Sequence, residues 1–157
     1  MKKYELTDDT ITVGGRILHR IKALKSFSDV EEGDLGGYVE KEDNLDHSGE
    51  AWVSGNAWVY GNAWVYGDAR VSGDARVSGD ARVSGENDYA AAKGFGREYR
   101  TTTFFRLQDG GIGVRCGCFC GTLEEFREKV KETHKESKMG KEYLMLADLM
   151  EYKFKNA

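Results

Sequence analysis

Between Gly49 and Ser84 the chain repeats one six-residue phrase six times without a gap. The phrases are GEAWVS, then GNAWVY twice and GDARVS three times. A fixed short period indicates a solenoid, in which each repeat buries its apolar side against its neighbours. Ala and Val stand two residues apart in every phrase, so on a strand both point to the same side and fill the interior. The Trp or Arg between them is expected to face outward, with Gly and its polar neighbour at the corner.

The six-residue period predicts a mainly β fold built around a short left-handed parallel β-helix. Each hexad supplies a short strand and a turn, and three hexads close one coil. Residues 18 positions apart are then expected to lie directly above one another. This register places Trp52 over Arg70, Trp58 over Arg76, Trp64 over Arg82, Tyr60 over Ser78 and Tyr66 over Ser84.

The recurring aliphatic and small residues, such as Val53 with Ala57, resemble the hexapeptide-repeat family. That family includes acyltransferases and non-catalytic scaffolds. Two flanking phrases, GDLGGYVE at 33–40 and CGCFCGTLEEF at 116–126, are similar to those of phage and prophage proteins that are often labelled polymer-forming or hypothetical. This second resemblance covers most of the chain and implies a phage origin rather than an activity.

The repeat divides the chain into four predicted parts. An N-terminal hairpin is expected because Gly14 and Gly15 can form a tight turn between two strand-like runs. The β-helix begins imperfectly, since Val39 and Leu45 fall in the phase of Ala51, so about one degenerate coil precedes two clean ones. The parts are residues 1–32 (β-hairpin unit), 33–85 (left-handed β-helix), 86–100 (linker) and 101–157 (ββαα module).

The C-terminal module is predicted from a second hairpin and two helical patterns. The hairpin is expected over residues 101–107 and 112–120. Thr122 and Glu125 form a capping box that opens the first helix, because each side chain can satisfy a free backbone amide of the first turn. Apolar residues at helical spacing predict a second helix over about 141–154.

Composition argues against several classes of protein. The formal net charge is −4 and no segment is strongly basic, which disfavours general nucleic-acid binding. The sequence has no apolar run of membrane-spanning length and no signal-peptide pattern, so we expect a soluble protein in the cytoplasm of a bacterial host. Its three cysteines form an odd, clustered set, which suits a reducing cytosol.

Two interpretations apply to the outward-facing aromatic and basic residues of the coils. They could pack between coils, since a cation–π contact contributes about 0.5–1 kcal/mol at an exposed site. They could also form a recognition surface, because aromatic residues and Arg are enriched at interaction hot spots. We expect a mixture, in which Trp58 and Arg76 are structural while Tyr60 and Tyr66 each keep one open ring face. The candidate binding residues are Tyr60, Tyr66, Trp52, Trp58, Trp64, Arg70, Arg76 and Arg82, of which Arg70 or Arg82 could bind an anionic group.

Cys116, Cys118 and Cys120, with His134, are weak candidates for a zinc site. Alternate residues of a straight strand lie nearly 7 Å apart, whereas two sulfurs on one tetrahedral zinc lie about 4 Å apart. We therefore expect no metal, and we expect the three thiols, in phase with Val114, to line the sheet face that the helices cover.

The sequence gives no catalytic constellation and no cofactor motif. No repeat contains His, and His47 lies just before the clean repeats in the phase of Val53. A general base needs a positioned partner and a cleft, and neither is visible in the pattern.

The expected function is that of a non-enzymatic, phage-encoded binding protein that engages a host protein or a small anionic ligand. Inhibition of a bacterial defence system is a role that the phage resemblance implies. A self-assembling structural protein and a hexapeptide-type acyltransferase are the alternatives. The exposed Trp52, Tyr60 and Trp64 predict a homo-oligomer, with a trimer ahead of a dimer by family analogy.

Overall fold

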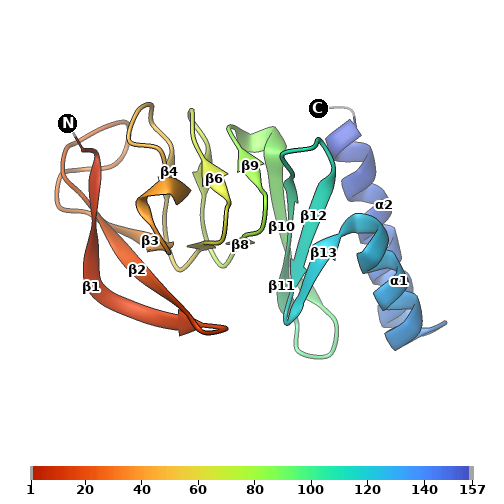
Figure 1. Ribbon diagram of the computed structural model, residues 1–157. Helices are drawn as coiled ribbons and strands as arrows, with labels where there is room; N and C mark the ends of the chain where they lie inside the picture. The colour runs from red at the N-terminus through yellow and green to blue at the C-terminus, as the bar shows by residue number, and fades with distance from the viewer. Residues whose placement is uncertain (1, 156–157) are drawn as a thin grey trace.

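The computed structural model describes residues 2–155. The protein is mainly β, with 41% of residues in strands and 23% in helices. Figure 1 shows successive layers along the molecule: an N-terminal hairpin, the solenoid, an upright four-stranded sheet, and two helices on the far side of that sheet. Within residues 2–155 no helix is long and apolar enough to cross a membrane.

The six hexads form six short strands, and each of the first three pairs in parallel with the strand three hexads later. Trp58 pairs with Arg76 and Val59 with Val77, which confirms the predicted spacing of 18 residues. The interior Ala and Val residues are at most 1% exposed. Gly at each corner has φ between +63° and +71°, a left-handed conformation that Gly adopts without strain. The strands are β4 (Trp52–Val53), β5 (Trp58–Val59), β6 (Trp64–Val65), β7 (Arg70–Val71), β8 (Arg76–Val77) and β9 (Arg82–Val83).

The degenerate start of the solenoid has a different register from the one predicted. β3 (Leu35–Val39) pairs in parallel with β5, with Val39 opposite Val59, 20 residues on. Leu45 likewise bridges to Val65, 20 residues on. Val39 and Leu45 therefore occupy the Val position of the hexad, and the predicted Ala phase is wrong. The two extra residues lie between Leu45 and the first clean hexad, so His47 falls outside the repeat phase.

The N-terminal hairpin extends one face of the solenoid. It consists of β1 (Tyr4–Val13) and β2 (Arg16–Ala23), with Gly14 and Gly15 in the turn at φ +55° and +82°, as the sequence predicted. β2 pairs antiparallel with β3, which gives the continuous sheet β1-β2-β3-β5-β8. The pairing of β1 with β2 is irregular between Leu6 and Thr10.

Residues 86–100 are not a linker, because they contain the 3₁₀ turn η2 (Glu86–Asp88) and a strand that pairs with the Thr-rich strand after it. The expected strand over 112–120 is also two strands, since the chain turns at Gly117 with φ +57°. The predicted capping box is confirmed, and Thr122 Oγ1 accepts from the Glu125 amide. The elements are β10 (Tyr89–Phe95), β11 (Arg100–Arg106), β12 (Ile112–Cys116), β13 (Phe119–Thr122), α1 (Leu123–His134) and α2 (Lys138–Lys155).

The C-terminal sheet caps the end of the solenoid. Phe105 of β11 is 2% exposed and joins the solenoid core, whereas its neighbour Phe104 joins the core beneath the helices. This division follows from the alternation of side chains along a strand. The contact includes backbone groups, since Ala81 bridges to Leu107 and the Arg76 amide donates to Thr103 Oγ1 at 2.9 Å.

Candidate functional site

Two of the aromatic residues expected on the coil perimeter are buried within the chain. Trp52 is 3% exposed and packs against Phe27, with ring centroids 5.4 Å apart. Tyr60 is 8% exposed and packs with Leu18 and Tyr38 beneath the N-terminal hairpin. The prediction that Tyr60 keeps an open ring face is therefore wrong, because the hairpin covers this side chain. Burial of both residues also removes two of the three side chains on which the homo-oligomer was predicted, and that assembly stays a prediction.

Trp58 and Arg76 form the stacked pair that the register predicted. The guanidinium carbon of Arg76 lies 3.7 Å from the Trp58 ring centroid. Nη1 of Arg76 also donates to the backbone carbonyl of Asn56 at 3.1 Å, and Arg82 makes the equivalent bond to Asn62 at 2.8 Å. The Arg of these repeats thus holds a corner carbonyl of the preceding coil. Sequence reasoning missed this role because the partner is a backbone atom.

The other two Trp/Arg pairs lie in register without cation–π contact among residues 2–155. Trp64 stacks instead on Tyr66, with ring centroids 3.9 Å apart and planes 17° apart. Arg70 forms an ion pair with Asp29 at 3.1 Å. Trp64 is 38% exposed and Tyr66 is half-buried, so solvent still reaches this pair, as it does the half-buried Trp58.

The cysteines do not share one face of the sheet, which corrects the predicted arrangement. Cys116 packs with the core beneath the helices, and Cys118 is exposed at the turn after Gly117. Cys120 follows that turn and contacts Ser78 of the solenoid, with Sγ and Oγ 3.7 Å apart. The turn resets the alternation of side chains, so the thiols point in different directions. In the described part of the chain no three His, Cys, Asp or Glu residues are placed to hold a metal ion.

His47 is part of a polar cluster beside the first coil. Its ring stacks on Tyr4 at a centroid distance of 4.2 Å, with planes 12° apart. Nδ1 accepts from the Lys3 amide at 3.1 Å, and Nε2 lies 2.9 Å from a Glu42 carboxylate oxygen. Since Nδ1 accepts, Nε2 carries the hydrogen and donates to Glu42. Both ring nitrogens are engaged, which favours a structural role for His47.

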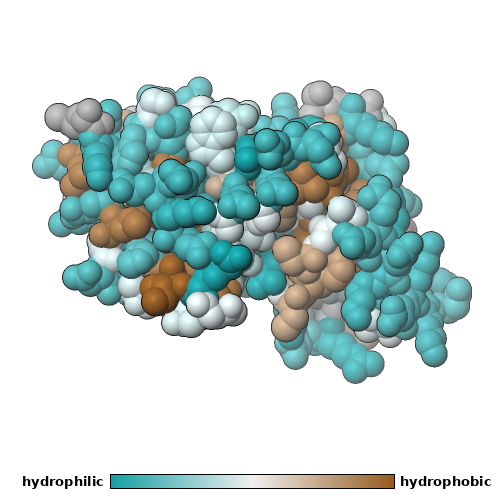
Figure 2. Space-filling view, in the orientation of Figure 1, coloured by the Kyte–Doolittle hydropathy of each residue, from teal (hydrophilic) through white to brown (hydrophobic). Residues whose placement is uncertain are grey.

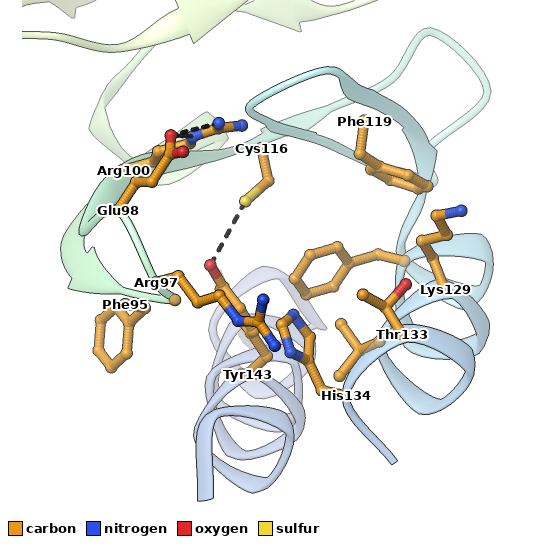
Figure 3. Close-up of a pocket in the computed structure, with 13 residues that line it drawn as sticks. Phe95, Arg97, Glu98, Arg100, Cys116, Phe119, Lys129, Thr133, His134 and Tyr143 are labelled. Carbon is orange, nitrogen blue, oxygen red and sulfur yellow. Dashed lines mark hydrogen bonds and ion pairs between the residues drawn. The ribbon is translucent and has the colours of Figure 1, made fainter. Parts of the chain in front are cut away.

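A pocket of about 350 Å³ lies between the C-terminal sheet and the two helices. Figure 3 shows Tyr143 rising from α2 toward the sheet, with His134 and Thr133 of α1 on the other side. The aromatic and apolar side chains include Phe95, Phe119, Phe126, Val130 and Tyr143. Phe126 and Val130 lie on the buried face of α1 and Tyr143 on that of α2, and nothing in the sequence indicates that they enclose a hollow.

Cationic side chains gather at the same pocket. Arg97, Arg100 and Lys129 line it with His134, against the single carboxylate of Glu98. Glu98 is already bonded to Arg100, whose Nε donates to it at 2.8 Å. Arg97 and Lys129 therefore leave the pocket with a surplus of positive charge. Both lie outside the residues singled out in the sequence, and Arg97 belongs to the segment taken for a linker.

Tyr143 provides a polar group inside the apolar part of the pocket. Cys116 Sγ donates to Tyr143 Oη at 3.7 Å, and Thr102 Oγ1 donates to the same sulfur at 3.3 Å. Burial and the neighbouring Cys116 raise the pKa of Tyr143 well above its usual range. The hydroxyl is therefore neutral near pH 7 and keeps a hydrogen that it can donate to a ligand.

A second hollow of about 590 Å³ follows a side of the solenoid and includes the exposed Trp64. Its charged groups are mixed, since Glu42, Asp43, Asp46 and Asp80 face it together with Lys41 and Arg82. Figure 2 shows a largely hydrophilic face of the molecule, on which hydrophobic residues form small, separate groups. The pocket of the C-terminal module thus combines apolar lining and net positive charge in a way that this groove does not.

Comparison with known proteins bears on the solenoid alone. A sequence model of the YdcK β-solenoid repeat matches residues 51–67 and 63–79. The two matches begin at Ala51 and Ala63, two hexads apart, and both lie among the strands β4–β8. The chain therefore contains a β-solenoid repeat similar to that of YdcK. Among curated proteins, none matches this chain.

Proposed function

We propose that this chain is a non-enzymatic binding protein whose C-terminal module takes a small ligand with an aromatic or apolar body and an acidic group. The observation that carries the proposal is the pocket of about 350 Å³, where aromatic side chains and surplus cations converge. Pockets of this size, apolar with a few placed polar groups, are typical of small-molecule sites. An acidic ligand would be held by Arg97 and Lys129, while its body packs on the Phe119 and Phe126 rings.

Binding rather than catalysis is favoured by how the polar groups of the pocket are arranged. His134 meets Tyr143 ring to ring, with centroids 5.6 Å apart and planes 37° apart. This contact does not pass a proton between the two side chains. Nucleophilic or acid–base catalysis instead needs a side chain within hydrogen-bond reach of its base.

The covered ends of the solenoid favour a binding protein over a polymer that grows by stacking coils. Phe105 and the backbone bridge of Leu107 close one end, and Tyr4 with the hairpin closes the other. Unpaired strand edges are the usual template for joining chains. The proposal also includes three further points: the coil is left-handed, the protein is of phage origin, and it acts on a host target in the bacterial cytoplasm.

The proposal is tested with an aromatic anion, 1-anilinonaphthalene-8-sulfonate, and its uncharged analogue N-phenyl-1-naphthylamine. Fluorescence titration should show saturable binding of the sulfonate at one site and weaker binding of the neutral dye. Lys129→Glu should weaken sulfonate binding at least fivefold, because it reverses a charge at the pocket. Lys131→Glu is the matched control, since Lys131 is exposed on the same helix and does not line the pocket.

Equal loss of sulfonate binding in the two variants would show that the dye responds to net charge alone. Equal affinity for the two dyes would show that the pocket does not recognise an acidic group. Either result would contradict the proposal. Melting temperatures of both variants, which change exposed positions, should stay near that of the parent protein.

A further inference from the structure

A groove of about 420 Å³ lies where the solenoid meets the C-terminal module. One wall is formed by Trp58 of β5 and Arg76 of β8, and the other by the β10–β11 hairpin and by β12, which stand beside the solenoid in Figure 1. Lys93, Arg100 and Arg115 face the groove from this second wall. The groove is thus lined by four cationic side chains.

Two of these four cations already have carboxylate partners. Lys93 forms an ion pair with Asp74, the acidic residue of the groove, at 3.2 Å. Arg100 is bonded to Glu98. The guanidinium of Arg76, by contrast, donates to backbone carbonyls, with its shortest bond to the Asp74 carbonyl at 2.7 Å. These bonds orient Arg76 without neutralising its charge.

Arg115 is the least satisfied of the four. Its Nε is buried and has no hydrogen-bond partner among residues 2–155, and its guanidinium lies 6.0 Å from the centroid of the Tyr60 ring. Burial lowers the pKa of Arg76, the Asp74 carboxylate partly opposes this, and the positive charge of Arg115 adds to the lowering. A partly buried cation without a counter-charge is unfavourable, and a second cation close by makes it more so. The one carboxylate of the groove, Asp74, is shared with Lys93, so the positive charges of Arg76 and Arg115 are not fully balanced.

Tyr99 places an aromatic ring at the same groove. It lines the groove, it is 67% exposed, and its φ of +51° lies in the left-handed region. Non-glycine residues adopt this conformation at a cost, and such residues gather at functional sites. An exposed aromatic ring beside cations offers a face on which a planar group can stack.

We propose that this groove binds the phosphate group of a small ligand between the guanidiniums of Arg76 and Arg115, with a planar part of the ligand stacked on Tyr99. A phosphate fits better than a carboxylate, because up to two negative charges are needed to balance two guanidiniums, and guanidinium donors match phosphate oxygens. A small ligand fits better than a nucleic acid, because the chain has a net charge of −4. This site shares Arg100 with the pocket beneath the helices, but Arg76, Arg115 and Tyr99 line the groove alone, and the proposal does not depend on ligand binding in that pocket.

The test is calorimetric titration with phenyl phosphate and with inorganic phosphate, in a low-salt buffer free of phosphate. Phenyl phosphate should bind more tightly than inorganic phosphate. Tyr99→Ala should remove that difference and leave inorganic phosphate binding unchanged. Arg115→Gln should weaken both ligands at least tenfold, and Arg115→Lys should retain part of the affinity.

Arg82→Gln is the matched control for charge, because Arg82 occupies the same hexad position as Arg76 but lines the groove near Trp64. It should leave both affinities unchanged. Equal weakening by Arg82→Gln and Arg115→Gln would overturn the proposal, as would the absence of binding at millimolar ligand. Lys129→Glu, which alters the pocket, should leave phenyl phosphate binding intact. Loss of binding in that variant would place the ligand in the pocket and overturn the groove assignment.

Discussion

The guanidinium of Arg76 lies 3.7 Å from the ring centroid of Trp58, and the two residues face each other across the paired strands β5 and β8. The pair Trp64 and Arg82 has the same register on another side of the coil, but Trp64 stacks on Tyr66 instead. The same sequence spacing therefore gives two different contacts. The Trp64–Arg82 pair can serve as an internal control when the contribution of the Trp58–Arg76 stack to stability is measured.

Trp58→Ala and Arg76→Ala are expected to show a coupling of about 0.5–1 kcal/mol in a double-mutant cycle of unfolding free energies, because the two side chains are in contact. The corresponding cycle with Trp64→Ala and Arg82→Ala should give a coupling near zero. Urea unfolding monitored by circular dichroism measures all the variants. Equal coupling in the two cycles would contradict a specific role for the stack.

Gly96→Ala is expected to deform the pocket. A Cβ at Gly96 would lie 2.3 Å from Tyr143 Oη, so the hairpin or the Tyr143 side chain would have to move. Gly94→Ala is the control, because Gly94 also has positive φ but has no atom within 4 Å of a Cβ at that position. Both variants should lose about 1–2 kcal/mol of stability, because Ala has a Cβ that disfavours positive φ. Only Gly96→Ala should also weaken binding of the anilinonaphthalene sulfonate. Retained dye affinity in Gly96→Ala would show that the ligand does not need this position of Tyr143.

The hexad pattern predicted the solenoid well because its spacing depends only on neighbouring repeats. Val59 and Val77 lie opposite each other as their period requires. What covers each coil depends on segments far away in the sequence. Tyr60 resembles Tyr66 in its own hexad, but the N-terminal hairpin covers Tyr60 and leaves Tyr66 half-buried. No local pattern distinguishes the two.

The candidate pocket was missed for a related reason. Residues 90–92 are Ala and are flanked by glycines at 94 and 96, so the segment has low strand propensity by itself. It becomes β10 because the strand after it, with Thr101, Thr102 and Thr103, provides a partner. With residues 86–100 predicted as a linker, Arg97 could not be placed beside the helices, and the positive charge of the pocket could not be predicted.

Lys3 makes the stability of the hairpin unit depend on pH. Its side chain is fully buried, Nζ donates to the Ala51 carbonyl, and burial lowers the pKa from 10.5 to about 8. Between these two values the unfolded chain binds more protons than the folded chain, so the free energy of unfolding rises with pH. Below about pH 8 both states are protonated and this contribution to the pH dependence disappears.

Lys3→Met should abolish this rise, which in the parent protein amounts to at most about 1.4 kcal/mol per pH unit for one proton. Urea unfolding of both proteins from pH 7.5 to 9.5 measures the difference, and the exposed Lys2→Met serves as control. A parent-minus-variant difference that stays constant over this range would show that Lys3 keeps an ordinary pKa.

Phe105 closes the end of the solenoid, and its removal tests whether the cap prevents coils from joining. Phe105→Ala should cost about 3–5 kcal/mol, as truncation of a buried Phe does, and should open the last coil to pairing with another chain. Phe104→Ala is the matched control, since Phe104 is equally buried on the same strand but faces the helices. We therefore expect light scattering to show self-association that rises with concentration in Phe105→Ala and not in Phe104→Ala, at a temperature where both remain folded. If the two variants associate equally, general destabilisation is the cause of the association. If Phe105→Ala does not associate, the backbone contacts of Ala81 and Leu107 close the end of the solenoid by themselves.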